Sequence, residues 1–220
     1  SIHARLGENG AGKSTLVKIL CGVYQPDSGS ILLNNKQQSI SDPSISLSLG
    51  ISAIHQESVM FDELTVTENV FIGNHLTKSN GLVDWSSMQD KTHQLLKDLE
   101  ANIEPNEKIK DLSIAQRHIV QISRSLIHDA DIVIMDEPTA SLSQKEINEL
   151  YAIIRNLKNQ NKSIVFISHK LDEVMEVCDE FTVLRDGELI KSDLISNTNK
   201  DQLITHMAGR EVNQIFPKNN

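Results

Sequence analysis

The sequence predicts an α/β fold with a mostly parallel sheet as its core, an inserted helical subdomain and an antiparallel β element. The first observation is a strand-like stretch, SIHARL, that runs through a glycine-rich loop into a helix. The second is the alternation of short apolar runs with helical periodicity, which is typical of parallel sheets covered by helices. The third is a central block, residues 64–128, that shows helical patterns and no strand.

The loop after the first strand reads GENGAGKST and fills the P-loop template G-x-x-x-x-G-K-[ST] with Gly7, Gly12, Lys13 and Ser14 in register. Glycines let successive backbone N–H groups curl around phosphate oxygens, where a Cβ would interfere. Lys13 supplies a charge for the β- and γ-phosphates, and the Ser14 hydroxyl can ligate Mg²⁺. The helix that follows begins with N–H groups and a dipole that favour an anion. The motif therefore predicts a nucleoside triphosphate site.

Composition favours one sizeable globular domain with an inserted lobe. The 220 residues are 39% hydrophobic and 23% charged, which is enough apolar sequence for a core. The net charge of −9, without a run of Lys or Arg, argues against a nucleic-acid partner. Because no apolar run could span a membrane, and Cys21 and Cys178 lie far apart, we expect a cytoplasmic protein with reduced, buried thiols. Because Ser1 opens directly on a strand, we expect a fragment with a truncated first strand.

Between the first helix and the helical block, the pattern predicts two strands and a short helix. A strand covers residues 30–34, and Asp42 and Pro43 begin the helix. The second strand, 51–54, leads to Gln56, at the edge where parallel sheets hold their ligands. Taken alone, an exposed glutamine there is an ordinary loop residue.

The helical block is predicted to contain three helices. One begins near Thr67 and runs through VFIGNH, and after an Asn80-Gly81 turn a second covers residues 86–99. The third follows LSIAQ and has Ser113 as its N-cap. By itself it is a plain capped amphipathic helix. Its predicted apolar face consists of Ile114, Ile119, Ile122 and Leu126.

Two acidic residues end the next strand, which reads DIVIMDE. This is how a buried parallel strand delivers carboxylates to a sheet edge. Combined with the phosphate loop, Asp136 can hold Mg²⁺ through its waters, and Glu137 can orient or deprotonate a water. Without Lys13, the same pair would indicate a solvated turn. A helix follows over residues 143–157, with Ile147, Leu150, Ile153, Ile154 and Leu157 predicted to face inward.

The remaining chain predicts one more buried strand, a hairpin and a last helix. The strand, 163–167, delivers Ser168 and His169 to the same sheet edge, although a lone histidine is usually structural. An Asp-Gly turn between apolar runs indicates the antiparallel hairpin at 181–190. The last helix covers residues 201–207.

In their order along the chain, the motifs resemble those of the nucleotide-binding subunits of ATP-binding-cassette (ABC) transporters: GENGAGKST, the Gln56 loop, LSIAQ, DIVIMDEPTASLS and ISHK. Within that family, the chain resembles the first cassette of duplicated monosaccharide-importer ATPases, of the galactose/methylgalactoside type. Segments such as YQPDSG, LVDWSSM and CDEFTVLRDGE carry this closer likeness. The resemblance implies a P-loop NTPase fold of the ABC ATPase type. Its ATP-binding α/β core would comprise 1–63 and 129–220, and its helical signature subdomain 64–128.

The resemblance also implies ATP and Mg²⁺ as cofactors and gives roles to single residues. Glu137 would be the general base, His169 the γ-phosphate contact, and Gln56 a contact to Mg²⁺ or the attacking water that faces the membrane partner. Ser113 to Gln116 would serve the ATP of a second cassette, because the family's cassettes close head to tail. The implied catalytic residues are Lys13, Gln56, Glu137 and His169, and the implied metal ligands are Ser14, Gln56 and Asp136. The implied nucleotide-binding residues are Gly7, Glu8, Asn9, Gly10, Ala11, Gly12, Lys13, Ser14, Thr15, Ser113, Ala115 and Gln116.

The chain departs from the family pattern at several positions. Ala115 replaces the usual Gly of the signature, a small change that we expect binding to tolerate. Ser143 stands where Asp is common, which removes an expected contact between the two sites. Arg5 replaces an apolar residue in the first strand, so it must find a partner, reach solvent or weaken this end of the strand. The aromatic residue that stacks on adenine in the family would precede Ser1.

The function that the resemblance implies is ATP hydrolysis that powers import of a galactose-like or methylgalactoside-like sugar, at the cytoplasmic face of the membrane. The implied partners are a second nucleotide-binding domain, either a C-terminal cassette or another copy of the chain, and membrane permease subunits. A periplasmic or extracellular sugar-binding protein would act indirectly. Two alternatives stay open: a nucleotide-gated clamp with little activity of its own, and a soluble ABC ATPase without a transport role.

Overall fold

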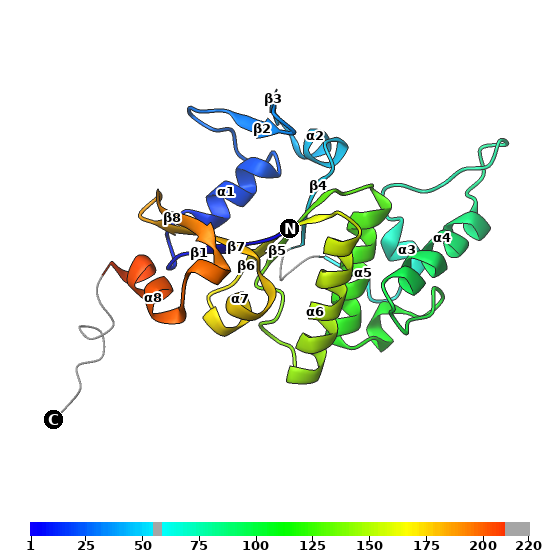
Figure 1. Ribbon diagram of the computed structural model, residues 1–220. Coiled ribbons are helices and arrows are strands. Elements are labelled where there is room, and N and C mark those ends of the chain that lie inside the picture. The colour runs from blue at the N-terminus through cyan, green and yellow to red at the C-terminus, as the bar shows by residue number, and fades with distance from the viewer. Residues whose placement is uncertain (55–58, 210–220) are drawn as a thin grey trace.

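A six-stranded sheet with the strand order β4-β5-β6-β1-β7-β8 forms the centre of the molecule (Figure 1). The computed structural model describes residues 1–54 and 59–209. Strands β4 to β7 pair in parallel along this order, and β8 pairs antiparallel to β7. The predicted, mostly parallel core is therefore confirmed. The strands of this sheet are β1 (Ile2–Leu6), β4 (Ile51–Ile54), β5 (Ile132–Asp136), β6 (Ser163–Ile167), β7 (Glu180–Arg185) and β8 (Glu188–Leu194).

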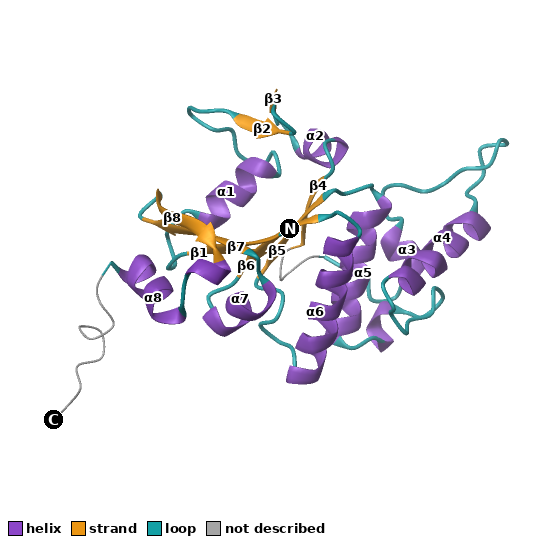
Figure 2. Ribbon diagram, in the orientation of Figure 1, coloured by secondary structure: helices purple, strands orange, loops and turns teal. Residues whose placement is uncertain are grey.

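Helices cover both faces of the sheet, with α1 and α2 above it and α6, α7 and α8 below it in Figure 2. The α-helices are α1 (Lys13–Leu20), α2 (Pro43–Ser48), α3 (Val66–Val70), α4 (Trp85–Asp98), α5 (Ile114–Ile127), α6 (Gln144–Asn159), α7 (Leu171–Val177) and α8 (Lys200–Ala208). Short 3₁₀ turns, η1 (Ile109–Asp111) and η2 (Ile195–Asn197), precede α5 and α8.

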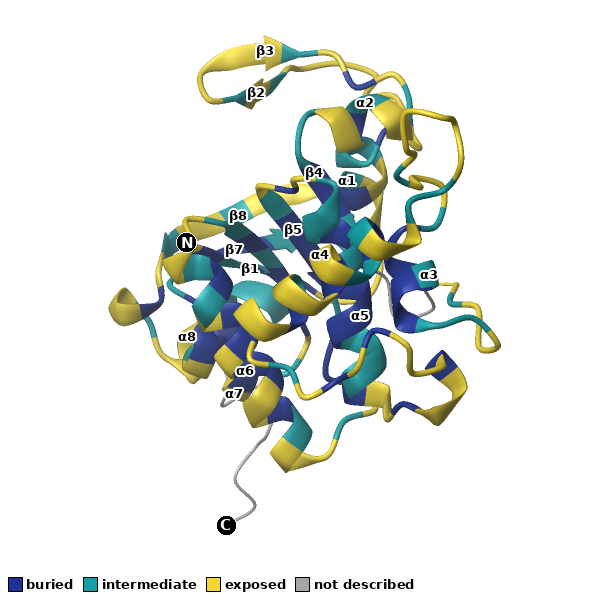
Figure 3. Ribbon diagram, turned by 90° about the vertical axis from the view of Figure 1, so that its right-hand side faces the viewer, coloured by how far each residue is buried: buried dark blue, intermediate teal, exposed yellow. Residues whose placement is uncertain are grey.

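The core has two parts because successive side chains of a strand point to opposite faces. In β6, Ile164 and Phe166 pack into the larger cluster with α5, α6, α7 and α8, whereas Val165 and Ile167 pack into the smaller cluster with α1 and α2. Strands buried on both faces need apolar residues at every position, which explains the continuous apolar runs in the sequence. Figure 3 shows the resulting concentration of buried residues in the sheet and along α5.

Helix α6 follows its sequence pattern closely. Ser143 is its N-cap and forms a capping box with Glu146: each side chain accepts a hydrogen bond from the other residue's backbone amide. All the predicted inward positions are buried, and Tyr151 is buried with them.

The prediction for α3 was wrong in its start and its length. The N-cap is Thr65, which forms a capping box with Glu68, and the helix ends at Val70 instead of continuing through His75. Thr67 is buried inside the helix, where its hydroxyl donates to the carbonyl of Pro105. The capping box is a local contact between residues three apart, and its Thr65-x-x-Glu68 pattern is the sequence signal that the prediction missed.

The helical block lies at one end of the molecule, where α3 and α4 flank α5 on the right of Figure 1. In the described residues between Val59 and His128 there are helices and isolated bridges, and no strand. The predicted face of α5 is buried at Ile119 and Ile122, and Leu126 packs against it. Ile114 does not belong to that face: it is 48% exposed, because the first helical residue lies beyond the edge of the packed stripe. The division into two parts stays a prediction.

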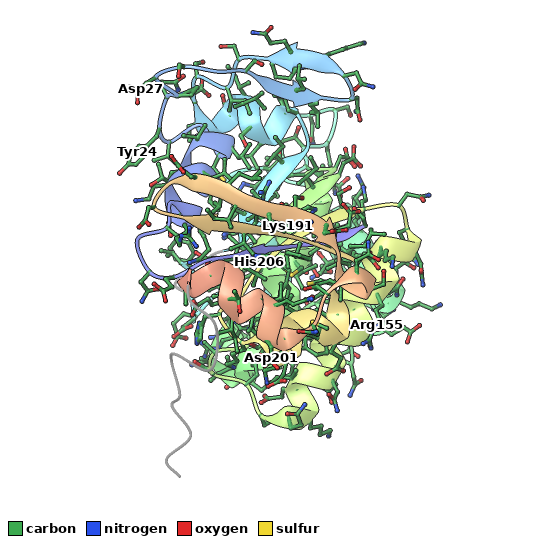
Figure 4. The ribbon with its side chains drawn as sticks, turned by 60° about the vertical axis from the view of Figure 1, so that its left-hand side comes forward. Tyr24, Asp27, Arg155, Lys191, Asp201 and His206 are labelled. Atoms are coloured by element: carbon green, nitrogen blue, oxygen red, sulfur yellow. The ribbon has the colours of Figure 1, made fainter. Side chains whose placement is uncertain are left out.

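The antiparallel elements are one predicted hairpin and one that the sequence pattern missed. The β7–β8 hairpin has the predicted Asp-Gly turn but extends to Leu194, and α8 packs against it, with Lys191 and His206 on the same side of the molecule in Figure 4. The missed strand, β3 (Lys36–Gln38), pairs with β2 (Ile31–Leu33) in a separate two-stranded sheet. Its turn residues, Asn34 and Asn35, both have positive φ, as tight hairpin turns require.

Arg5 lies on the face of β1 that also carries His3. It has no hydrogen bond or ion pair with any residue that the structure describes, and burial lowers the pKa of its guanidinium. The side chain is half-buried. Of the three predicted outcomes, partial access to solvent is the one observed.

The two cysteines are free thiols. Burial, followed by the nearby charges of Asp179 and Glu173, raises the pKa of the Cys178 thiol to about 12. Cys178 is buried as expected, whereas Cys21 is partly exposed.

Within the described part of the chain, no helix has both the length and the apolar character needed to cross a bilayer.

Phe166, fully buried in the middle of β6, provides a test of this core. We expect Phe166→Ala to reduce the free energy of unfolding by about 3–5 kcal/mol, because it removes a large apolar side chain and leaves a cavity. Leu189→Ala is the control, because Leu189 is 63% exposed and its loss should cost less than about 0.5 kcal/mol. Urea unfolding curves measure both, and equal losses would contradict this description of the core.

Candidate functional site

The loop between β1 and α1 has the backbone of a phosphate cradle. Gly7 and Gly12 have φ values of 153° and 97°, a region that favours glycine. A Cβ at Gly7 would collide with the backbone carbonyl of Leu184. Gly12 is the N-cap of α1 and supplies no side-chain hydrogen bond to the helix, and no acidic residue occupies the first turn. The first amides of α1 therefore lack a side-chain acceptor and suit an anion.

Lys13 places a positive charge inside this loop. Its Nζ atom donates to the backbone carbonyls of Gly7, at 2.7 Å, and Glu8, at 3.0 Å. Burial lowers the pKa of Lys13, while the charges of Glu137 and Asp136 raise it. The ammonium group thus lies between neutral carbonyls and two carboxylates, where phosphate oxygens would be stronger acceptors than the carbonyls.

A cavity of about 300 Å³ joins the loop to the end of β5. The Ser14 hydroxyl and the Asp136 carboxylate both line it, and such oxygen donors suit Mg²⁺ when phosphates and waters complete the coordination. In the described ranges, no group of three or more His, Cys, Asp or Glu side chains could hold a metal by itself. The cavity is lined by Asn9, Gly10, Gly12, Lys13, Ser14, Thr15, Asp136 and Glu137.

Glu137 directly follows β5 and has an unusual backbone. Its φ of 47° lies in the left-handed region, which costs a residue with a side chain about 1–3 kcal/mol. Its amide donates to the carbonyl of Ile167, at 2.9 Å, and so ties the end of β5 to the end of β6. This turn brings Oε1 of Glu137 to 2.9 Å from Nδ1 of His169. Because an ionised carboxylate can only accept, the imidazole Nδ1 carries the hydrogen in this contact.

The residues of the LSIAQ motif lie elsewhere. Ser113 is the N-cap of α5 and forms a capping box with Gln116, so the predicted cap is confirmed. Ser113 and Gln116 line a separate cavity of about 970 Å³ between α5 and α6, together with Ser143. Ala115 is buried beside them. None of these residues lines the cavity of the phosphate loop.

The structure therefore gathers most of the predicted site at one edge of the sheet. Lys13, Asp136 and Glu137 line one cavity, and His169 joins them through Glu137. Gln56, which the sequence assigned to the same edge, lies outside the described residues.

Sequence reasoning missed one charged residue next to this site, Glu173 on α7. It is 7% exposed, and Thr139 and Ser168 donate hydroxyl hydrogen bonds to its carboxylate. The sequence signal was weak: an acidic residue among the apolar positions Leu171, Val174 and Val177.

Comparison with known proteins places the chain in a family. The family model described as ABC transporter matches residues 1–140, more than half of the chain. Ribose import ATP-binding protein RbsA 3 of Rhizobium etli is 50% identical over 218 residues, which are 99% of this chain and 43% of that protein. The putative ribose/galactose/methyl galactoside import ATP-binding protein 2 of Burkholderia lata is 43% identical, over 99% of this chain and 41% of its own length. The chain thus spans less than half the length of these relatives.

Solved structures agree on the fold. The ADP conformation of MJ1267, an ATP-binding cassette of an ABC transporter, superposes with a TM-score of 0.81 at 24% identity, over 95% of this chain and 88% of that one. A nucleotide-free ATP-binding cassette from an ABC transporter gives a TM-score of 0.76 at 24% identity, over 95% of this chain and 84% of that one. The P-loop fold of the ABC ATPase type is confirmed. Because the family model covers residues 1–140, which include the phosphate loop and the acidic end of β5, the chain belongs to the ABC transporter family.

Proposed function

We propose that this chain is an ATP-binding and ATP-hydrolysing cassette that powers import of a monosaccharide. The observation that carries the proposal is the cavity that Lys13, Ser14, Asp136 and Glu137 share, with His169 in contact with Glu137. The loop amides and Lys13 would bind the phosphates of ATP, and Ser14 and Asp136 would hold Mg²⁺. When bound, Mg²⁺ neutralises charge on the transferring phosphate.

The side chains around Glu137 are arranged for a general base. Its carboxylate would accept the proton of the attacking water, and the hydrogen bond from His169 fixes the orientation of that carboxylate. Phosphoryl transfer depends mainly on positioning and charge neutralisation, so the strained turn at Glu137 fits this role. Gln56, which lies outside the described residues, would complete the site.

A second cassette would complete the nucleotide site. Support comes from the separate position of the signature residues Ser113, Ala115 and Gln116, which do not line the phosphate cavity. From their own surface they could reach the ATP of another cassette, either a second copy or a C-terminal cassette. The core and the helical signature subdomain would meet near residues 63–64 and 128–129.

The sugar is inferred from the names of relatives. Those at 46–50% identity are named for ribose import, and those at 42–43% carry names that combine ribose, galactose and methyl galactoside. This supports a monosaccharide more strongly than galactose in particular. The partners would be membrane permease subunits and, indirectly, a sugar-binding protein, with the cassette peripheral to the cytoplasmic face of the membrane.

Replacing Lys13 tests the phosphate site. We expect Lys13→Ala to lower ATP turnover about 100-fold or more, because the group that neutralises the phosphates is lost. Lys18→Ala is the matched control on the same helix, since Lys18 is exposed and lies over the Tyr24 ring instead of in the cavity. Phosphate release by the purified chain with Mg²⁺ and ATP measures both. Equal turnover by Lys13→Ala and Lys18→Ala would refute the site.

Replacing Glu137 separates binding from hydrolysis. We expect Glu137→Gln to bind ATP with an affinity within a few-fold of the unmodified chain, because the amide has the same shape. Turnover should fall about 10²–10⁴-fold, because the amide cannot accept the proton. Glu104→Gln, at an exposed position, is the control. Undiminished hydrolysis would refute the general base. ATP binding by an unmodified chain that does not hydrolyse would instead favour the nucleotide-gated clamp.

The sugar is tested with the chain assembled with its permease in vesicles. We expect uptake of a labelled monosaccharide that depends on ATP and is lost in the Glu137→Gln variant, because the same hydrolysis drives transport. Uptake of labelled ribose and of labelled galactose, measured in parallel, shows which of the two sugars is transported. ATP turnover that no monosaccharide stimulates would contradict a sugar-import role.

A further inference from the structure

Helix α7 carries a buried carboxylate, that of Glu173, which contacts the loops after β5 and β6. The Glu173 side chain is 9% exposed, and acidic groups are rarely buried so deeply unless they are paired. Glu173 has three such partners. Thr139 Oγ1 lies 2.7 Å from each carboxylate oxygen, Ser168 Oγ lies 3.1 Å from Oε2, and Lys170 Nζ lies 3.0 Å from Oε1.

These three partners come from the two loops that carry the proposed catalytic pair. Thr139 lies two residues after Glu137, in the loop that follows β5. Ser168 and Lys170 lie on either side of His169, in the loop that follows β6, and the amide of Lys170 also donates to Ser168 Oγ, at 3.0 Å. One buried carboxylate therefore connects both loops.

The connection matters because Glu137 has a strained backbone. Residues in the left-handed region persist where the surrounding structure over-determines their conformation. On one side, the Glu137 amide is bonded to the carbonyl of Ile167 at the end of β6. On the other side, Thr139 is bonded to Glu173. The contact between Glu137 and His169 thus depends on anchors on both sides.

We propose that Glu173 is a positioning residue that sets the geometry of Glu137 and His169. This proposal rests on the proposed function, because the reaction that it assists is ATP hydrolysis. A buried charge with several donors holds its partners more tightly than a neutral group would. Glu173 acts through the two loops and does not touch the nucleotide.

The test replaces Glu173 and its partner in the full chain. We expect Glu173→Gln to lower kcat about 10–100-fold, the cost of a misplacement of roughly 1 Å, with the ATP dissociation constant changed less than about threefold. Thr139→Val should behave similarly, and Thr139→Ser, which keeps the hydroxyl, should restore most of the lost turnover. The matched control is Glu176→Gln, on the same helix, because Glu176 is exposed and pairs at 3.7 Å with Arg155. Figure 4 labels Arg155 on the surface of α6.

A double-mutant cycle excludes a role in folding alone. Because Glu173 acts by positioning Glu137 and His169, part of its effect should be lost once His169 is removed, so the loss of kcat in His169→Ala/Glu173→Gln should be smaller than the two single losses added on a logarithmic scale. Losses of kcat that add fully on a logarithmic scale would overturn the proposal. An unchanged kcat in Glu173→Gln would also overturn it. So would a decrease in turnover that is fully explained by a smaller fraction of folded protein.

Hydrogen exchange provides a readout that needs no turnover. In Glu173→Gln, the amides of Glu137 and Lys170 should exchange faster, because Glu173 accepts hydrogen bonds from both loops. The same amides should not change in Glu176→Gln, because Glu176 pairs with Arg155 on α6 instead. Unchanged exchange at both amides would overturn the proposal. If the unmodified chain bound no ATP, the proposed function would fail, and this exchange measurement would still decide whether Glu173 anchors the two loops.

Discussion

The register between β5, β6 and β1 is the constraint on which the candidate site depends. Asp136 lies opposite Ile167 on one side, and Arg5 lies opposite Ile167 on the other. Three parallel strands therefore end at one level of the sheet. The phosphate loop, Glu137 and His169 follow these strands, so they lie at the same edge of the sheet. A slip of one residue would turn each of these side chains to the opposite face.

Positive and negative charges lie close together at this edge of the sheet. Lys13 sits among loop carbonyls and within the fields of Asp136 and Glu137, which oppose the effect of burial on its pKa. Two carboxylates so close to a phosphate cradle would repel a polyanion unless cations intervene. The loop amides, the start of α1 and Lys13 supply positive potential, and a divalent ion fits the remaining oxygen donors. Under the proposed function, this balance would suit a nucleotide that carries Mg²⁺ better than a free anion.

Stability and site geometry are linked through α7. The helix packs through Leu171, Val174 and Val177 in the main core, which brings Glu173 into contact with the loops after β5 and β6. Burying this carboxylate is favourable only because two hydroxyl groups and an ammonium group meet it there. The same contacts support a left-handed turn at Glu137 that would otherwise relax.

The sequence by itself determined the class of the fold, the phosphate loop and most of the strands and helices, because local glycines, apolar periods and capping residues act within a few positions. It also identified Asp136, Glu137 and His169 as ends of buried strands. The strand β3 was missed although its partner β2 lies just before it in the sequence. The exposure of Ile114 and the position of α3, where the amides of Val66 and Thr67 donate to the carbonyls of Glu107 and Pro105, were decided by the tertiary structure. The buried contacts of Glu173 with two separate loops were likewise a product of the tertiary structure. The periodicity of apolar residues does not indicate which hydrogen-bond donors will contact a buried carboxylate, because these contacts depend on how the strands pair.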